Sequence, residues 1–277
     1  MNERVHVLLP AHNRRAVTEK CIADLKAQTW DNLRVVFIDD GCTDGTAEMV
    51  LRHLPEATVL RGTGDWWWAG SLQQGFDWLE RSGAGPDDIV LILNDDTTFG
   101  PEFVASAVAV LRQRRRALLL ARLYDSATGK LVEVGVHADW RTLGFRGVME
   151  PEQVNCFATR GLFLRFGDIL AIGGFHTVLL PHYGSDYEYT MRAHRKGFAL
   201  ISDSGVRLAF SEETTGLRHA RKQPLPAVLR AAFTKRALYN PLYWSAFVML
   251  TCPVRYVPMN LFRVWRGFGR QVLEAIR

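Results

Sequence analysis

The stretch Val35–Thr46, VVFIDDGCTDGT, decides how this chain folds, because an apolar run stops abruptly at a run of polar residues. Its first four residues are apolar, which is typical of a buried strand. Asp39 and Asp40 stand where this strand ends. A helix is expected to follow, with Thr43 or Asp44 as its N-cap. A strand followed directly by a helix is the repeating unit of an α/β domain.

The same unit recurs through the first 123 residues. Strands are expected at VHVLLP (5–10), LRVVFIDDG (33–41), ATVLRG (57–62), DDIVLILNDD (87–96) and ALLLARL (117–123). Helices are expected at residues 14–28, 43–54, 71–82 and 101–114. This alternation predicts a mainly parallel, Rossmann-like sheet with helices on both faces.

The pattern changes after residue 123. We expect a hairpin or irregular strands over 130–148, a strand over 154–165, and a helix over 185–198 that Gly197 closes. Residues 1–220 are therefore expected to form one α/β domain, and residues 221–277 a basic, aromatic helical tail.

The positive charge of the chain is concentrated in that tail. The whole chain has a net charge of +5, whereas residues 225–277 contain eight Arg and Lys against one Glu, a net charge of +7. A basic segment favours an anionic partner. The aromatic and aliphatic residues beside these charges favour a membrane surface over nucleic acid.

The uncharged run 237–254 could be read as a membrane span, since a span needs roughly 17–25 apolar residues. It contains Asn240, Pro241 and Pro253, however. We therefore expect helices that lie at the membrane interface or re-enter it. A buried pair of C-terminal helices is the alternative.

Composition limits the class of protein. A hydrophobic content of 48% and a charged content of 23% are globular values. The four cysteines are scattered without a CxxC pair, which argues against a zinc site or a disulfide framework. The start of the chain shows no secretory pattern. We expect a cytoplasmic protein that is peripheral at the inner face of the cell membrane; a homo-oligomer is left open.

Acidic residues stand at the ends of two expected strands. Ligands of open α/β sheets bind at the carboxyl ends of the strands. Asp39, Asp40, Asp95 and Asp96 should therefore converge on one edge, where they repel each other unless a cation or donor groups compensate. Carboxylate oxygens suit Mg²⁺ or Mn²⁺, which bridges to phosphates. A turn or cap is the ordinary alternative for any single Asp, above all for Asp44.

Six motifs in this order and spacing resemble the family 2 glycosyltransferases: LLPAHNR, VVFIDDGCTDGT, LILNDDT, ATRGLFLR, IGGF and YGSDYEYTMRAHRKG. The resemblance covers roughly residues 4–215 and leaves the tail outside. It implies a GT-A nucleotide-sugar fold and transfer of a sugar with inversion of the anomeric centre.

The resemblance also implies a donor site. The segment Pro10, Ala11, His12, Asn13 and Arg14 matches the loop around the base and ribose, and Asp39 matches the acid that binds the pyrimidine imide. Asn94, Asp95 and Asp96 match the Asp-x-Asp metal motif. Asn94 departs from it and leaves one carboxylate fewer, so Asp96 is the best ligand for Mn²⁺ or Mg²⁺.

The SDYE segment matches the family's catalytic acids and assigns Asp186 as the general base. An ordinary N-cap is the alternative for Asp186. Where the family often has a further His ligand, this chain has Phe210 or Ser211, so His219 is the substitute candidate, with His182 as an outside one.

Three consecutive tryptophans follow the third expected strand in what resembles a donor loop. One of Trp66, Trp67 and Trp68 is expected to face the donor or acceptor, and another to anchor the loop in the core. Packing or a subunit contact is the alternative. The donor candidates here are Asp65, Trp67, Trp68, Gly70 and Ser71, and the acceptor candidates are Trp140, Gly174, Phe175 and Glu188.

The expected function is therefore an inverting glycosyltransferase of surface-polysaccharide synthesis. Its donor would be a UDP-hexose or, since DYEYTMR resembles a rhamnosyltransferase branch, dTDP-rhamnose. Its acceptor would be a hydroxyl of a saccharide or a lipid-linked sugar. A nucleotidyltransferase and a non-catalytic nucleotide-sugar-binding relative remain as alternatives.

Overall fold

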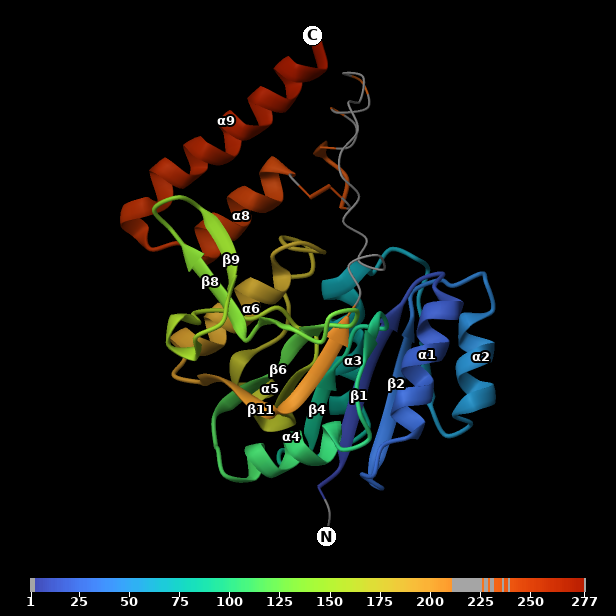
Figure 1. The fold of residues 1–277 in the computed structure, drawn as a ribbon. Helices are drawn as coiled ribbons and strands as arrows, with labels where there is room; N and C mark the ends of the chain where they lie inside the picture. The colour runs from blue at the N-terminus through green and yellow to red at the C-terminus, as the bar shows by residue number, and fades with distance from the viewer. Residues whose placement is uncertain are drawn as a thin grey trace.

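The structure is a computed structural model that describes residues 3–210, 226, 229, 232–235, 237–238 and 240–276. A central sheet dominates it (Figure 1). The strands lie in the order β3 (Thr58–Arg61), β2 (Leu33–Asp39), β1 (Val5–Ala11), β4 (Ile89–Ile92), β10 (Leu162–Arg165), β6 (Ala117–Asp125), β11 (Ala199–Phe210) and β5 (Thr97–Thr98), and β7 (Leu131–Glu133) pairs with β6.

The predicted parallel sheet is confirmed for its first half. Strands β3, β2, β1 and β4 are parallel neighbours. The second half is mixed, because β10 is antiparallel to both β4 and β6, whereas β11 is parallel to β6. The chain reaches β10 from the small hairpin β8 (Gly135–Asp139) and β9 (Gly144–Val148), not through a crossover helix, so it is not constrained to enter in parallel.

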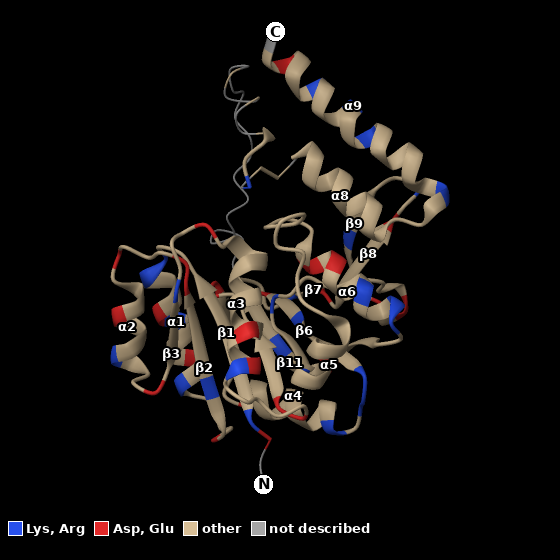
Figure 2. Cartoon of the chain, turned by 180° about the vertical axis from the view of Figure 1, so that it is seen from behind, with Lys and Arg blue, Asp and Glu red and all other residues tan. Residues whose placement is uncertain are grey.

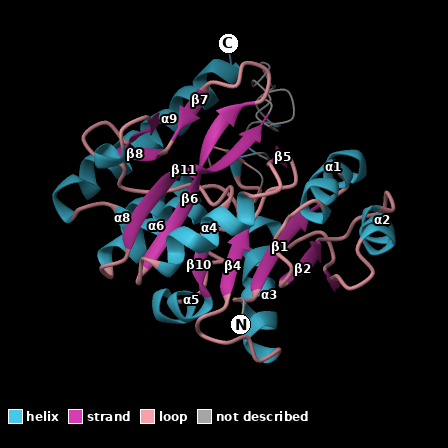
Figure 3. Ribbon diagram, turned by 60° about the horizontal axis from the view of Figure 1, so that its bottom comes forward, coloured by secondary structure: helices cyan, strands magenta, loops and turns pink. Residues whose placement is uncertain are grey.

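Helices cover both faces of the sheet, as the alternation of strands and helices predicts (Figure 3). On one face α1 (Arg15–Lys26), α2 (Thr46–His53) and α4 (Phe103–Arg112) pack against Val5, Val7 and Leu9 of β1. On the other, α3 (Trp67–Arg81), α5 (Phe166–Ile172) and α6 (Ser185–Arg195) pack against Leu8 of β1. Because side chains of a strand alternate between faces, an unbroken apolar strand serves both cores.

The strand expected over 154–165 is shorter than predicted. Only Leu162–Arg165 forms a strand; before it, Cys156 makes one isolated bridge with Val136. The reason lies in α6. The Thr190 hydroxyl accepts a hydrogen bond from the Phe157 N–H at 2.9 Å and donates to the Phe157 carbonyl at 3.0 Å. A helix side chain therefore satisfies backbone groups that a neighbouring strand would otherwise pair.

The described part of the C-terminal segment contains the helices α8 and α9, in agreement with the predicted helical character of the tail. Helix α8 (Pro241–Thr251) begins at a Pro, and the Asn240 side chain caps it by accepting the N–H groups of Leu242 and Tyr243. Helix α9 (Val257–Ile276) follows a short turn η2 (Val254–Tyr256). None of the described helices has a run apolar enough, over sufficient length, to cross a bilayer.

A third, smaller core joins α8 to the domain. Phe247 of α8 is buried with Met191 of α6 and with Val136 and Ala138 of the hairpin. The Arg195 guanidinium donates to the Leu250 carbonyl at 2.9 Å. Helix α8 is therefore packed onto α6, whose first turn contains Asp186, and α9 lies beyond it (Figure 1). The boundary expected at residue 220 lies outside the described residues.

Candidate active site

The loops after β1 and β2 are joined by hydrogen bonds at the carboxyl edge of the sheet. The His12 Nδ1–H donates to the Asp40 carbonyl at 2.6 Å, and the Asn13 side-chain oxygen accepts the Thr43 N–H at 2.7 Å. Asn13 has a left-handed backbone, with φ of 53°, which Asn tolerates better than most residues. The segment predicted to hold the nucleotide base is thus a fixed loop that the β1–β2 register places beside Asp39.

Asp39 is buried and held in place by two donors. Its Oδ1 accepts the Cys42 N–H at 2.7 Å, and its Oδ2 lies 3.4 Å from the Arg61 guanidinium. Arg61 comes from the end of β3, one strand further along, and was not foreseen from the sequence. The N-cap of α2 is Gly45, so the prediction of Thr43 or Asp44 as the cap was wrong. Asp44 has the turn role that was its alternative, since its carboxylate accepts the N–H groups of Arg15 and Thr46, the first residues of α1 and α2.

Asp40 has a structural use that the sequence did not indicate. Its carboxylate accepts the N–H groups of Gly64, Trp66 and Trp67 at 2.9–3.2 Å. A carboxylate at a helix start satisfies donors that have no partner within the helix. Helix α3 therefore begins at Trp67, four residues before the expected start. The prediction of a loop across the tryptophans was wrong there, because the capping acid lies 27 residues away in sequence.

The three tryptophans differ in their packing. Trp66 and Trp68 pack against the core on the α3 face, and the Trp68 indole N–H donates to the Thr159 hydroxyl at 3.0 Å. Trp67 has a left-handed backbone and lies edge-on to His182, with ring centroids 5.5 Å apart. An anchoring role is therefore confirmed for Trp66 and Trp68, and Trp67 is the indole that is not part of this core.

Three further donor candidates lie before and within the first turns of α3. Asp65 is exposed, and its carboxylate forms a 2.5 Å ion pair with Lys235, a residue of the segment before α8. This contact lowers the pKa of Asp65. Gly70 and Ser71 are buried in the first turns of α3, where Gly70 faces Trp66: a Cβ there would lie 3.2 Å from the Trp66 Cβ.

Arg14 joins the two acids that follow β4. Its guanidinium lies 3.1 Å from an Asp95 oxygen and 3.4 Å from an Asp96 oxygen. The Thr18 hydroxyl donates to the second Asp95 oxygen at 2.9 Å. Burial nevertheless raises the pKa of Asp95 to about 6. The Arg14 guanidinium and the Thr18 hydroxyl are thus donor groups of the kind predicted to offset the repulsion between clustered carboxylates.

Two side-chain oxygens of the segment Asn94–Asp96 suit a divalent cation. The Asn94 Oδ1 and the Asp96 Oδ1 are buried and have no hydrogen-bond partner among the described residues. Both are hard oxygen donors, of the kind that Mg²⁺ and Mn²⁺ prefer. The described residues contain no group of three or more His, Cys, Asp or Glu side chains placed to hold a metal. The donor set thus fits an ion that also takes water and phosphate oxygens, with Asp96 as its carboxylate.

Asp186 lies at the start of α6. It is half-buried, and its Oδ1 accepts the Tyr187 N–H at 2.9 Å. Burial raises its pKa from 3.8 to about 6, against the opposing effect of backbone N–H groups and of Arg160. Burial also raises the pKa of Glu133, whose charge interacts with Arg160 and Asp186. A carboxylate with a pKa near neutrality is suited to accept a proton.

Arg160 connects Asp186 to the acids of the sheet edge. Its guanidinium carbon lies 5.1 Å from the centre of the Phe210 ring, and Phe210 pairs with Thr97, the residue after Asp96. The N-terminal end of antiparallel β10 and the carboxyl end of β11 therefore meet the Asp96 loop at the same edge. Arg160 and Glu133 were not among the predicted site residues, although ATRGLFLR, which contains Arg160, was among the motifs.

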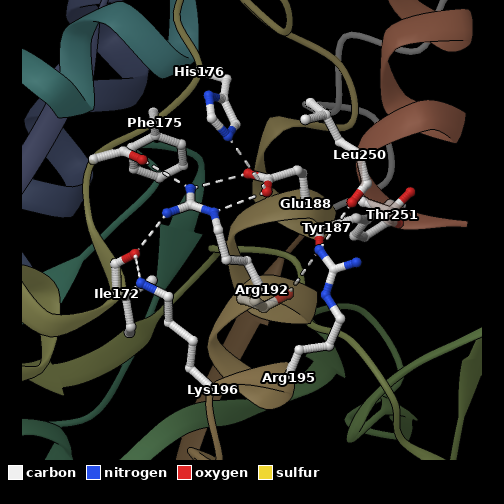
Figure 4. Close-up of polar contacts among 12 residues, drawn as sticks. Ile172, Phe175, His176, Tyr187, Glu188, Arg192, Arg195, Lys196, Leu250 and Thr251 are labelled. Atoms are coloured by element: carbon white, nitrogen blue, oxygen red, sulfur yellow. Dashed lines mark hydrogen bonds and ion pairs between the residues drawn. The ribbon is translucent and has the colours of Figure 1, made fainter.

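The predicted acceptor residues have mainly packing contacts. The Glu188 side chain is 2% exposed and binds Arg192 through both oxygens, at 2.8 and 3.0 Å (Figure 4). Arg192 in turn donates to the carbonyls of Ile172 and Gly174, at 2.8 and 2.7 Å. Glu188 therefore holds Arg192 in the position from which it links α6 to the segment after α5.

Phe175 and Trp140 are likewise packed. Phe175 is buried and stacks on Tyr189, with ring centroids 4.6 Å apart. Trp140 lies against Phe247 of α8, and its carbonyl accepts the Asn260 side chain of α9 at 2.9 Å. Three of the four acceptor candidates thus have packing or ion-pair contacts within the protein, and the role of all four in acceptor binding stays a prediction. The metal candidate His219, like Ser211, lies outside the described residues.

Two family models match this chain. One, Glycosyl transferase family 2, matches residues 6–170, and the other, Glycosyl transferase family group 2, matches residues 89–265. The chain therefore belongs to the family 2 glycosyltransferases and is a glycosyltransferase, not the nucleotidyltransferase that the acids alone left open. No curated protein matches it.

A solved structure shares the fold. It is described as the mannosyltransferase PcManGT from Pyrobaculum calidifontis in complex with GDP-Man and Mn²⁺. The match has a TM-score of 0.59 at 16% sequence identity and covers 100% of this chain and 74% of that chain. The sheet described above is thus the Rossmann-like GT-A fold, as predicted.

Proposed function

We propose that this protein transfers a sugar from a nucleoside-diphosphate donor to a hydroxyl group and inverts the anomeric centre. The observation that carries the proposal is the meeting of two groups of residues at one sheet edge. The β4 loop with Asp96 and the α6 start with Asp186 are linked through Phe210 and Arg160. The β4 loop with Asp96 suits a diphosphate with its cation, and Asp186 at the start of α6 suits the role of general base.

Asp186 is the proposed base. Its carboxylate takes the proton of the acceptor hydroxyl as the acceptor oxygen bonds to the anomeric carbon. The bond from that carbon to the diphosphate oxygen breaks on the opposite side, and the nucleoside diphosphate leaves. Attack opposite the leaving group inverts the centre. General-base catalysis of this kind contributes about 10²–10⁴ in rate.

The donor site is proposed to run along the loops after β1, β2 and β4. Asp39 would accept the imide of a pyrimidine base, and His12, Asn13 and Arg14 would line the nucleotide. Mn²⁺ or Mg²⁺, held by Asp96 with Asn94 beside it, would supply positive charge that stabilises the leaving diphosphate. Trp67 is the proposed aromatic contact to a sugar or base.

The chemical identity of the donor and of the acceptor is also part of the proposal. A UDP-hexose and dTDP-rhamnose are the donors that the sequence motifs favour, and GDP-mannose joins them because the solved mannosyltransferase is described with it. The acceptor is a saccharide or a lipid-linked sugar of a surface polysaccharide. The basic, aromatic C-terminal segment supports a place for this work at the inner face of the cell membrane.

The test is donor turnover. Purified protein is incubated with Mn²⁺ or Mg²⁺ and with UDP-, GDP- and dTDP-sugars, and the released nucleoside diphosphate is measured beside Asp186→Asn and Asp96→Ala. We expect release from one donor only with metal, lost in both variants. Asp186→Asn should still bind the donor, as a shift in melting temperature shows. If no donor raises the melting temperature of the wild-type protein, the proposal fails.

A further inference from the structure

Helix α9 exposes large apolar side chains along one face. Phe262, Trp265 and Leu273 are 65%, 46% and 63% exposed, and Met259 is 40% exposed. At 100° per residue, these positions fall within one third of the helix circumference. The opposite face contacts the protein: Asn260 is fully buried, and its side chain donates to the Trp140 carbonyl. The apolar face therefore points away from the domain.

Arg263 and Arg270 border this apolar face on one side, and Arg266 lies at its margin, between Leu273 and Met259. Arg263, Arg266 and Arg270 follow the helical spacing of three and four residues. None of them forms an ion pair with an acidic residue within the described part of the chain. The Arg266 guanidinium lies 5.9 Å from the Phe262 ring, next to the apolar face. Figure 2 shows positive segments along α9 and an acidic segment near its C-terminal end.

We propose that this face of α9, formed by Met259, Phe262, Trp265 and Leu273 with Arg263, Arg266 and Arg270, lies on an anionic phospholipid bilayer, with the helix axis parallel to the membrane plane. The inference deepens the proposed function and rests on its membrane location. An apolar stripe that enters the acyl boundary, bordered by cations at the headgroups, is the pattern of an interfacial helix. The helix lies on the membrane and does not cross it.

Charge decides between a bilayer and a second copy of the chain. In a two-fold dimer the same patch meets itself, so the arginines of one α9 would face those of the other. An anionic membrane surface instead attracts each Arg near it by about 1 kcal/mol, which is about a fivefold gain in binding. Nucleic acid would also attract the arginines, but it would leave Phe262, Leu273 and Met259 without an apolar partner.

The arrangement has a consequence for the site. Helix α9 packs on α8, and α8 packs through Phe247 on the glycine before α6, where a Cβ at Gly184 would lie 3.1 Å from the Phe247 ring. Two packed helices therefore separate the bilayer from Asp186. A membrane-bound acceptor would present its hydroxyl above the headgroups and not within the hydrocarbon.

The experiment is sedimentation of the full-length protein with vesicles of phosphatidylglycerol and phosphatidylcholine, or of phosphatidylcholine alone. We expect binding to the anionic vesicles that weakens as salt rises. Phe262→Ser with Trp265→Ser should reduce binding at least tenfold, and Arg266→Gln with Arg270→Gln by about 25-fold at low salt. Matched controls are Leu170→Ser on α5 and Arg52→Gln on α2, which should bind as the wild type does.

Three binding results would overturn the inference. They are no binding of the wild type to anionic vesicles, equal binding of both double variants, and tighter binding to duplex DNA than to vesicles. Dimerisation that Phe262→Ser abolishes would assign the face to a second copy and overturn it as well. Donor turnover is measured in parallel without vesicles. The α9 variants should turn over the donor as the wild type does. If the wild type shows no turnover, that result counts against the proposed function and not against the membrane contact of α9.

Discussion

At the scale of single residues, Asp186 shows which of two opposed effects prevails. A carboxylate at a helix N-terminus is usually stabilised by the helix dipole, by about 0.3–1 kcal/mol, which lowers its pKa by less than one unit. Burial can raise a carboxyl pKa by several units. The pKa of Asp186 is about 6, above its ordinary 3.8, so burial prevails. The sequence motif indicates the residue, and its surroundings give it the proton affinity of a base.

The first prediction concerns Asp186→Asn. Because the folded-state pKa is raised, the ionised carboxylate destabilises the fold, and this cost appears as pH rises from about 4 to 6. The variant should therefore be more stable at pH 8, by at most about 3 kcal/mol, and equally stable below pH 4. Turnover should fall about 10²–10⁴-fold. Thermal melts at both pH values and donor turnover measure this; a variant that is less stable at pH 8 would contradict it.

The second prediction concerns the neighbours of Asp186. Arg160 favours the ionised form of Asp186, and Glu133 opposes it. Arg160→Gln should therefore move the acidic limb of the pH–activity profile to higher pH, and Glu133→Gln should move it to lower pH. Wild type should gain activity as pH rises through about 6. Profiles of kcat with saturating donor measure this, and shifts of the same sign in both variants would exclude the electrostatic explanation.

At the scale of elements, α3 depends on residues distant in sequence. Asp40 supplies its N-terminal acceptor, and Gly75 allows it to approach the sheet. A Cβ at Gly75 would lie 2.9 Å from a Leu8 methyl and 3.2 Å from an Ile38 methyl. Helix propensity alone would make Ala the better residue here. Packing against β1 and β2 requires Gly.

The third prediction is that Gly75→Ala destabilises the protein. The substitution gains about 1 kcal/mol of helix propensity. Forcing a methyl group into a filled core costs typically 1–3 kcal/mol and occasionally more, so we expect a net loss of about 1 kcal/mol. Denaturant melts measure the free energy of unfolding. Gly83→Ala is unsuitable as a control because its φ is +74°, so Gly100→Ala, with open space around it, is the matched substitution.

At the scale of the whole molecule, the C-terminal helices and the catalytic domain share a core. Phe247 is buried among residues of α6 and the β8–β9 hairpin, and its ring contacts Trp140, Phe145 and Trp244. The helical tail is therefore not an independent appendage in this arrangement. It supports the helix that positions Asp186.

The fourth prediction is that Phe247→Ala affects both stability and catalysis. Removing a buried Phe side chain typically costs about 3–5 kcal/mol. Turnover should also fall at temperatures where the protein remains folded, because the start of α6 loses its support. Leu242→Ala on the exposed side of α8 should cost less than about 0.5 kcal/mol and leave turnover unchanged. Normal turnover in folded Phe247→Ala would show that α8 does not position Asp186.

Much of the fold follows from local patterns in the sequence. The apolar runs with polar ends, Val5–Ala11 and Leu33–Asp39 among them, specify strands, and the order of such strands predicts which edge of the sheet binds ligands, because open α/β sheets bind them at the carboxyl ends of the strands. Asp39, Asp96 and Asp186 are predicted as site residues because their motifs keep their order along the chain. The C-terminal helices and their charge could likewise be read from composition.

The contacts between segments that are distant in sequence are known only from the tertiary structure. Asp40 starts α3, Arg160 contacts Phe210 and favours the ionised form of Asp186, and Arg192 donates to the carbonyls of Ile172 and Gly174. The packing of α8 onto α6 belongs to the same group. A single sequence shows which residues are polar or apolar, since that is a property of each side chain. It does not show which partner each one meets, because a hydrogen bond or a packing contact depends on segments that the fold brings together.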